Sequence, residues 1–129
     1  LLLPITRLLP SDDPRVRKTI EAIDRELTID GWVHRFVPCA IDGIAPLPMG
    51  EYEGAFVLCT AWLASAWAIA GEPDRAASIL ERIDSASGEL GLLAEGIDAR
   101  SGEYLGNTPL LFSHVEYVRA VLELDRSNT

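Results

Sequence analysis

Apolar residues recur at helical spacing near the start of the chain. Between Val16 and Leu27 they return every three or four positions, with charged residues between them, as in a helix with one buried face. The run Ser11-Asp12-Asp13-Pro14 predicts where this helix starts, because an Asp side chain accepts free backbone N–H groups and Pro fits the first helical position. We therefore expect an amphipathic helix from residue 14 to about Leu27. The apolar segment before it, residues 1–9, is either the end of a buried helix or an apolar linker.

A different pattern begins at residue 55. Residues 55–70 contain no charged side chain and are apolar on nearly every face, which predicts a helix buried on most of its sides. Gly71 is a stop signal and Pro73 is a start signal, so a second amphipathic helix should follow over residues 74–87. A last buried helix is expected from residue 110 or 112 to Leu124. The order is therefore amphipathic, buried, amphipathic and buried.

Two long connections interrupt these helices. Asp30-Gly31 is a turn signal, and residues 31–37 favour a short extended piece. An irregular loop rich in Pro and Gly follows as far as Gly50, and residues 91–114 hold four glycines. A plain link between packed helices has about 2–8 residues. Because both long connections lie between an outer helix and the inner helix after it, we expect functional residues to gather at one end of an all-α fold.

The amino-acid composition limits the classes of molecule that this chain is expected to bind. The chain has 129 residues, 48% of them hydrophobic, which is enough for one domain with a core. Its 20 acidic and 11 basic residues give a net charge of −9, which argues against nucleic acid or an anionic membrane as partner. Cys39 and Cys59 are expected to be reduced and buried. A chain that opens without Met inside an apolar segment suggests a piece of a larger protein, and a cytoplasmic location is the default expectation.

Glu95 is the strongest candidate for chemistry. It follows the apolar run Leu92-Leu93-Ala94, so it should lie in a partly dry position, where burial disfavours the charged form of a carboxylate and suits it to act as a general base. The alternative from spacing alone is that Glu95 is a solvated loop acid and that Asp98 caps a turn. No pattern of metal ligands, phosphate-binding loop or cofactor-binding motif is present, so no metal or cofactor is expected.

The short sequence motifs around Glu95 resemble those of a known family. They are Gly91-Leu-Leu-Ala-Glu95, Asp98, Ser101-Gly102-Glu103, Leu105-Gly106-Asn107, Pro109 and Phe112-Ser113-His114. In order and spacing they resemble the C-terminal catalytic segment of glycoside hydrolase family 15, which contains glucoamylases, glucodextranases and one class of trehalases. The resemblance implies an incomplete α/α toroid with long loops at one end. Residues 1–129 would be a C-terminal fragment of a catalytic domain with six inner and six outer helices.

The same resemblance implies a chemistry. The family cleaves α-glucosidic bonds with inversion, using one carboxylic acid and one carboxylate. The match places the general base on Glu95 and the general acid upstream of this chain, so the fragment alone should be inactive. An α-glucoside and the rest of the catalytic domain are then the expected partners.

Three further residues are candidates for holding the sugar. Arg35, in His34-Arg35-Phe36, matches a family Arg that holds hydroxyl groups of the first glucose unit, and its alternative is a salt bridge to a nearby acid. Glu53, in Glu53-Gly54-Ala55-Phe56, is expected to bind sugar or to be a first-turn acid of the following helix. Trp32 is a candidate to stack on a sugar ring. His114 is expected to pack or to support other residues of the site.

The sequence departs from the family pattern at two positions, and one alternative function remains open. Gly96 and Leu110 replace polar residues that the family pattern has at these positions, which puts the activity and the choice of sugar in question. The alternative function is a non-catalytic helical-hairpin module that binds sugar or protein. The isolated fragment should expose the flanks of the helix at residues 55–70 and either associate with itself or behave as a molten state.

Overall fold

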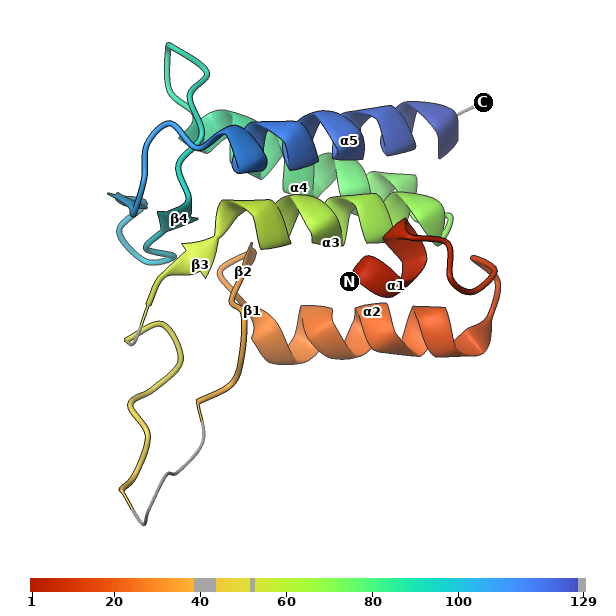
Figure 1. Ribbon diagram of the computed structural model, residues 1–129, viewed down its shortest axis with the longest axis horizontal. Helices are drawn as coiled ribbons and strands as arrows, with labels where there is room; N and C mark the ends of the chain where they lie inside the picture. The colour runs from red at the N-terminus through yellow and green to blue at the C-terminus, as the bar shows by residue number, and fades with distance from the viewer. Residues whose placement is uncertain (39–43, 52, 128–129) are drawn as a thin grey trace.

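A computed structural model describes residues 1–38, 44–51 and 53–127 of the chain (Figure 1). Cys39 lies outside these residues. The fold is built from helices, as expected, with short strands at one end. The helices are α1 (Leu2–Ile5), α2 (Pro14–Leu27), α3 (Val57–Ile69), α4 (Pro73–Ala86) and α5 (Leu111–Ser127), and the strands are β1 (Thr28–Ile29), β2 (Trp32–Val33), β3 (Ala55–Phe56), β4 (Gly96–Ile97) and β5 (Tyr104–Leu105).

Helix α3 is the centre of the molecule and contacts every other helix (Figure 1). Nine of its 13 residues are buried, which follows from the absence of charge along the helix. It begins two residues later than the sequence pattern predicts, because Ala55 and Phe56 pair with β4 as a strand. Gly71 ends it in the left-handed conformation with φ +79°, which a residue without Cβ adopts freely.

The two amphipathic helices, α2 and α4, both pack against α3, and Asp24 of α2 pairs with Arg75 of α4. Asp13 caps α2, and its side chain accepts the N–H of Arg15 at 2.8 Å. The buried stripe of α2 packs with Leu63 and Trp67 of α3 in one apolar cluster. Pro73 starts α4 as expected. This order of inner and outer helices is that of a partial α/α toroid. None of the helices in the described part of the chain is long and apolar enough to cross a membrane.

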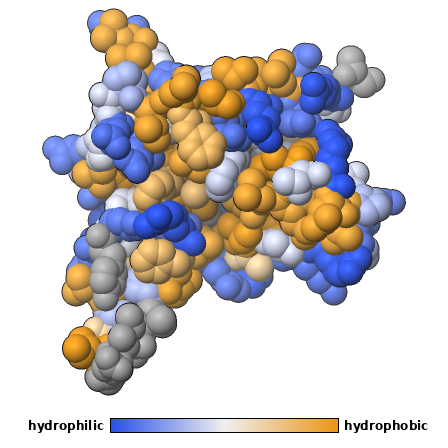
Figure 2. Space-filling model, viewed as in Figure 1, coloured by the Kyte–Doolittle hydropathy of each residue, from blue (hydrophilic) through white to orange (hydrophobic). Residues whose placement is uncertain are grey.

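Helix α5 departs from the expectation. It was expected to be buried, yet only Ser113, Glu116 and Ala120 are buried along its 17 residues. The expected exposure of the flanks of α3 is wrong, because α4 and α5 cover them. Several exposed apolar side chains lie along α5, and the surface along it is partly apolar in Figure 2. This α5 face consists of Leu111, Phe112, Val115, Val118, Val121 and Leu122.

Short strands gather at one end of the helices, where both long connections lie (Figure 1). The β1–β2 hairpin turns at Asp30 and Gly31, which have φ +50° and +82°. A second sheet has the order β3-β4-β5, with Phe56 opposite Gly96 and Gly96 opposite Leu105. The sequence pattern did not predict this sheet. Because β3 and β4 are antiparallel, Glu95 lies beside Val57 at the end of β3, whereas Glu53 precedes the start of that strand.

Candidate active site

A cavity of about 280 Å³ opens at the three-stranded sheet. Glu53, Phe56, Glu95 and Leu105 are among the residues that line it. The cavity is therefore lined by all three strands, of which β3 is far from β4 and β5 in the sequence. It contains two of the four residues that the sequence assigned to a sugar site.

The backbone of Glu95 is held on both sides. Its N–H donates to the carbonyl of Asn107 at 2.9 Å, and its carbonyl accepts the N–H of Val57, the first residue of α3, at 3.1 Å. The side chain is partly buried, in line with the apolar residues before it. These bonds fix the position from which the carboxylate enters the cavity.

One oxygen of the Glu95 carboxylate is also fixed. The backbone N–H and the side-chain amide of Asn107 both donate to Oε2, at 3.2 and 2.9 Å. Gly106 wraps closely over the same carboxylate, since a Cβ at Gly106 would lie 2.7 Å from Oε2. The sequence reading did not assign a role to Asn107, although Leu105-Gly106-Asn107 was part of the motif. No local pattern shows that this loop folds back onto Glu95.

The segment before Glu95 is tied to the start of α5. Leu93 donates its N–H to Nε2 of His114 at 3.0 Å, and its carbonyl accepts the N–H of Leu110 at 2.8 Å. The buried Ser113 hydroxyl donates to the carbonyl of Ala94 at 2.7 Å. His114 thus supports the position of Glu95 and does not line the cavity.

Arg35 and Glu53 form an ion pair at the edge of the cavity. Arg35 donates from Nε to Oε1 at 2.9 Å and from Nη2 to Oε2 at 2.7 Å, the two-bond geometry that suits a guanidinium and a carboxylate. Its guanidinium lies 4.6 Å from the centre of the Phe56 ring. The hydrogen bond and charge of Glu53 raise the pKa of Arg35, and the charge of Glu95 adds to this shift. Arg35 is therefore electrostatically coupled to both acids.

The structure bears on the alternatives given for these two residues. Arg35 makes the salt bridge named as its alternative role, and half of its side chain, 54%, remains exposed. Glu53 lies before β3, four residues ahead of the first residue of α3, Val57. A first-turn position for Glu53 is therefore wrong, because the chain passes through a strand before the helix begins.

Trp32 lies elsewhere. Its side chain is only 6% exposed and packs against Ala61, Ile83, Leu93 and Ile97. Its ring is therefore covered by the protein's own core, and the structure does not bring it to the cavity that Glu53 and Glu95 line. Its small exposed part faces a separate cavity along α4.

The other predicted polar positions have structural partners. Asp98 caps a turn, as the alternative stated, and its Oδ1 accepts the N–H groups of Arg100 and Ser101 at 2.8 and 2.9 Å. These two bonds lower the pKa of Asp98. Within the described residues, no cluster of His, Cys, Asp and Glu could hold a metal ion. Cys59 is partly buried, and burial raises the pKa of its thiol to about 11.

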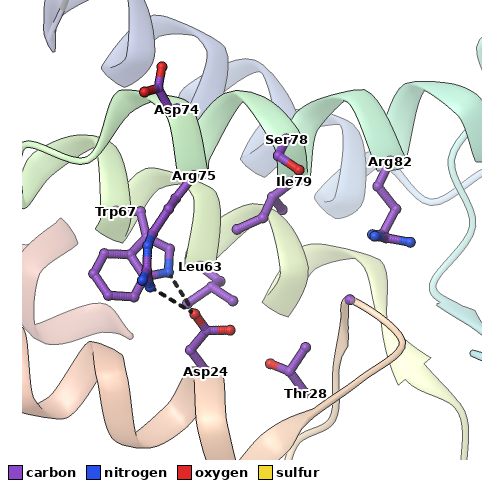
Figure 3. Close-up of a pocket in the computed structure, with 10 residues that line it drawn as sticks. Asp24, Thr28, Leu63, Trp67, Asp74, Arg75, Ser78, Ile79 and Arg82 are labelled. Carbon is purple, nitrogen blue, oxygen red and sulfur yellow. Dashed lines mark hydrogen bonds and ion pairs between the residues drawn. The ribbon is translucent and has the colours of Figure 1, made fainter.

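A larger cavity, about 410 Å³, lies between α2 and α4 with α3 as its floor (Figure 3). Asp24 of α2 accepts Nε1 of Trp67 at 3.1 Å and lies 3.6 Å from Nη1 of Arg75. The Arg75 guanidinium stacks 4.5 Å from the Trp67 ring. Trp67 is thus a core residue, and Asp24 provides the acceptor for its indole N–H.

Comparison with known proteins supports one family. The family model of glycosyl hydrolases family 15 matches residues 1–122. Trehalases of Mycolicibacterium smegmatis and Mycobacterium tuberculosis are 45% and 46% identical over 98% of this chain, and Trehalase 1 of Sulfolobus acidocaldarius is 34% identical over all of it. The chain spans 18%, 18% and 22% of these relatives, about a fifth of their length.

A solved structure described as a wild-type glycosidase has a similar fold. It matches with a TM-score of 0.71 and 28% sequence identity. The match covers 92% of this chain and 32% of that one. The arrangement of helices and short strands is therefore shared with part of a larger known structure.

Proposed function

Because this chain belongs to glycosyl hydrolases family 15, we propose that it is the C-terminal part of a glycosidase catalytic domain and supplies the general base. The observation that supports this most is the position of Glu95. Its carboxylate lines a cavity, has one oxygen held by Asn107, and lies in the field of Arg35. A carboxylate in such a setting can accept a proton from a water molecule.

The reaction is an inverting hydrolysis. Glu95 takes a proton from water, the water oxygen bonds to the anomeric carbon, and the glycosidic bond breaks as a second carboxyl group protonates the leaving oxygen. In inverting enzymes the two carboxyl groups are roughly 6.5–9.5 Å apart, which leaves room for the water. Glu53 shares the cavity but is unsuited to be the acid, because both of its carboxylate oxygens already accept hydrogen bonds from Arg35. We therefore assign the acid to polypeptide beyond these 129 residues.

Arg35 and Glu53 hold the sugar in this proposal. Two of the N–H groups of Arg35 bond to Glu53, and the guanidinium retains others that can donate to sugar hydroxyl groups. Glu53 fixes the guanidinium and offers acceptor lone pairs at the cavity wall. Together they supply both donors and acceptors to a neutral polyol, which needs no basic surface around it.

Trehalose is the substrate we propose. The curated relatives named above are trehalases, and the identity to two of them extends over 98% of this chain. The full-length protein should therefore release glucose from trehalose. Inversion at one of the two linked α-anomeric carbons would give one α- and one β-glucose, whereas retention would give α-glucose from both halves.

Proton NMR of the first minutes of the reaction tests this proposal. Equal early signals of α- and β-glucose from trehalose are the expected result. An early excess of α-glucose would contradict the inverting mechanism. Release of glucose from maltose but not from trehalose would contradict the substrate, and no hydrolysis of either sugar would contradict the assignment as a glycosidase.

A further inference from the structure

We propose that Asn107 is a positioning residue that selects which oxygen of Glu95 acts as the base. The inference rests on the proposed function of Glu95 and adds a residue to it. Asn107 occupies Oε2 with two hydrogen bonds, so Oε1 is the oxygen that receives the proton from water. The proton passes to Oε1 while the water oxygen bonds to the anomeric carbon.

The two bonds come from one residue and converge on one atom. The backbone N–H of Asn107 is 3.2 Å from Oε2 and the side-chain Nδ2 is 2.9 Å from it. Among the described residues, no donor bonds to Oε1. Donors on an ionised carboxylate form stronger bonds than neutral pairs do, so the carboxylate is held against rotation about its last side-chain bond.

The backbone of Asn107 is itself anchored. Its carbonyl accepts the N–H of Glu95 at 2.9 Å, which closes a ring of hydrogen bonds between the two residues. Gly106 lets the loop approach, since any Cβ there would meet Oε2. The loop and Glu95 are therefore placed relative to each other by the backbone, and the Asn107 side chain adds the final restraint on the carboxylate.

The charged groups near Glu95 do not replace this restraint. The charge of Glu95 contributes to the raised pKa of Arg35, but two N–H donors of Arg35 bond to Glu53. Glu53, on the wall of the same cavity, carries a like charge and cannot donate. Asn107 is thus the neutral donor that can orient Glu95 without adding charge to the cavity.

Substitution of Asn107 in the full-length protein tests the inference. Asn107→Ala removes Nδ2 and keeps the backbone N–H, whereas Asn107→Asp keeps the shape but places an ionised acceptor beside Oε2. We expect kcat on trehalose to fall about 10- to 100-fold in the Ala variant and further in the Asp variant, with KM within about 2-fold, since small misplacements of reacting groups cost about that much. Glu103→Ala, an exposed acid of the same loop, is the matched control.

The order of activity among the Asn107 variants distinguishes a positioning role from a packing role. A residue needed only for packing would tolerate Asp better than Ala. An Asp variant as active as the original protein, or a rise in KM at constant kcat, would overturn the inference. Asn107→Gln keeps an amide donor and replaces the Ala variant in the comparison if the latter melts early; it should be more active than Asp. Glu95→Gln distinguishes a failure of the proposed function from a failure of this inference. If the Glu95→Gln variant keeps its activity, the proposed function fails. If it loses activity but the Asn107 variants do not show the expected order of activities, only this inference fails.

Discussion

Arg35 and Glu53 are 18 residues apart in the chain and form a two-bond ion pair, with N–O distances of 2.9 and 2.7 Å, beside the carboxylate of Glu95. The pair joins the segment after the β1–β2 hairpin to the segment before β3. Because Glu53 lines the cavity, the pair fixes a cation next to it. The charge of Glu95 also contributes to the raised pKa of Arg35, so this cation offsets part of the negative charge of the two acids.

Glu95→Gln in the full-length protein should lower kcat on trehalose by about 10²- to 10⁴-fold, the usual contribution of a general base. The amide keeps the shape of the side chain but cannot accept a proton. KM should change little, because the sugar contacts are assigned to other residues. Glu103→Gln, which makes the same chemical change on an exposed position of the loop, should leave the rate unchanged.

Arg35→Ala should weaken trehalose binding by about 10- to 100-fold, the cost of losing hydrogen bonds to a charged group. Calorimetry on the inactive Glu95→Gln background measures binding without turnover. Arg25→Ala removes an exposed arginine of α2 that pairs with Glu26 and serves as the control. Equal affinities of the Arg35 variant and the control would remove Arg35 from the sugar site.

Gly106→Ala should abolish most of the activity. Gly106 has φ +74° and a Cβ there would lie 2.7 Å from Oε2 of Glu95, whereas Gly102 has φ +77° and nothing within 4 Å. Both Ala variants bear a similar strain from the left-handed conformation, about 1–2 kcal/mol, but only Gly106→Ala displaces the carboxylate. Similar kcat values for the two variants, at similar melting temperatures, would show that the close approach of Gly106 has no effect on catalysis.

Asp13 should stabilise α2 in a manner that depends on pH. Its hydrogen bonds with Arg15 lower its pKa from the ordinary 3.8 to about 2. A lowered pKa in the folded state means that the contribution is fully present above about pH 4 and is lost as pH falls toward 2. The melting temperatures of the protein and of its Asp13→Ala variant should differ at pH 6 and converge toward pH 2. A constant difference across this range would be the opposite result.

The 129-residue chain in isolation should associate through the α5 face. Val118 and Leu122 are 53% and 50% exposed, and exposed apolar patches of this kind promote association. Val118→Lys with Leu122→Lys should reduce the association seen in sedimentation velocity. Leu90→Lys, at an 82% exposed leucine in the connection after α4, should not. A chain that remains monomeric at all concentrations would contradict this prediction.

The helices could be predicted from the sequence because their signals are local. The start of α2 at Pro14 and the end of α3 before Gly71 depend on neighbouring residues alone. The pairing of Ala55 with Ile97 could not be predicted, since a strand of two residues has no periodicity. The contact of Asn107 with Glu95 was not expected either, because no local sequence pattern marks it.

The site was predictable to the extent that motifs mark it. Glu95 was found from the apolar run before it and from the family resemblance, and its cavity is formed by β3, β4 and β5. The acid that pairs with Arg35 could not be predicted, because the chain has 20 acidic residues. Trp32 was misplaced, because an aromatic residue near a turn gives no sign of whether its ring faces the core or a ligand.

The hydrogen bonds of Ser113 and His114 give helix α5 a mechanical role. The first turn of this helix holds Leu93 and Ala94, which lead to Glu95, while Val115 and Val118 are exposed on the same helix. A displacement of α5 would therefore disturb the two hydrogen bonds that fix the segment before the carboxylate of Glu95.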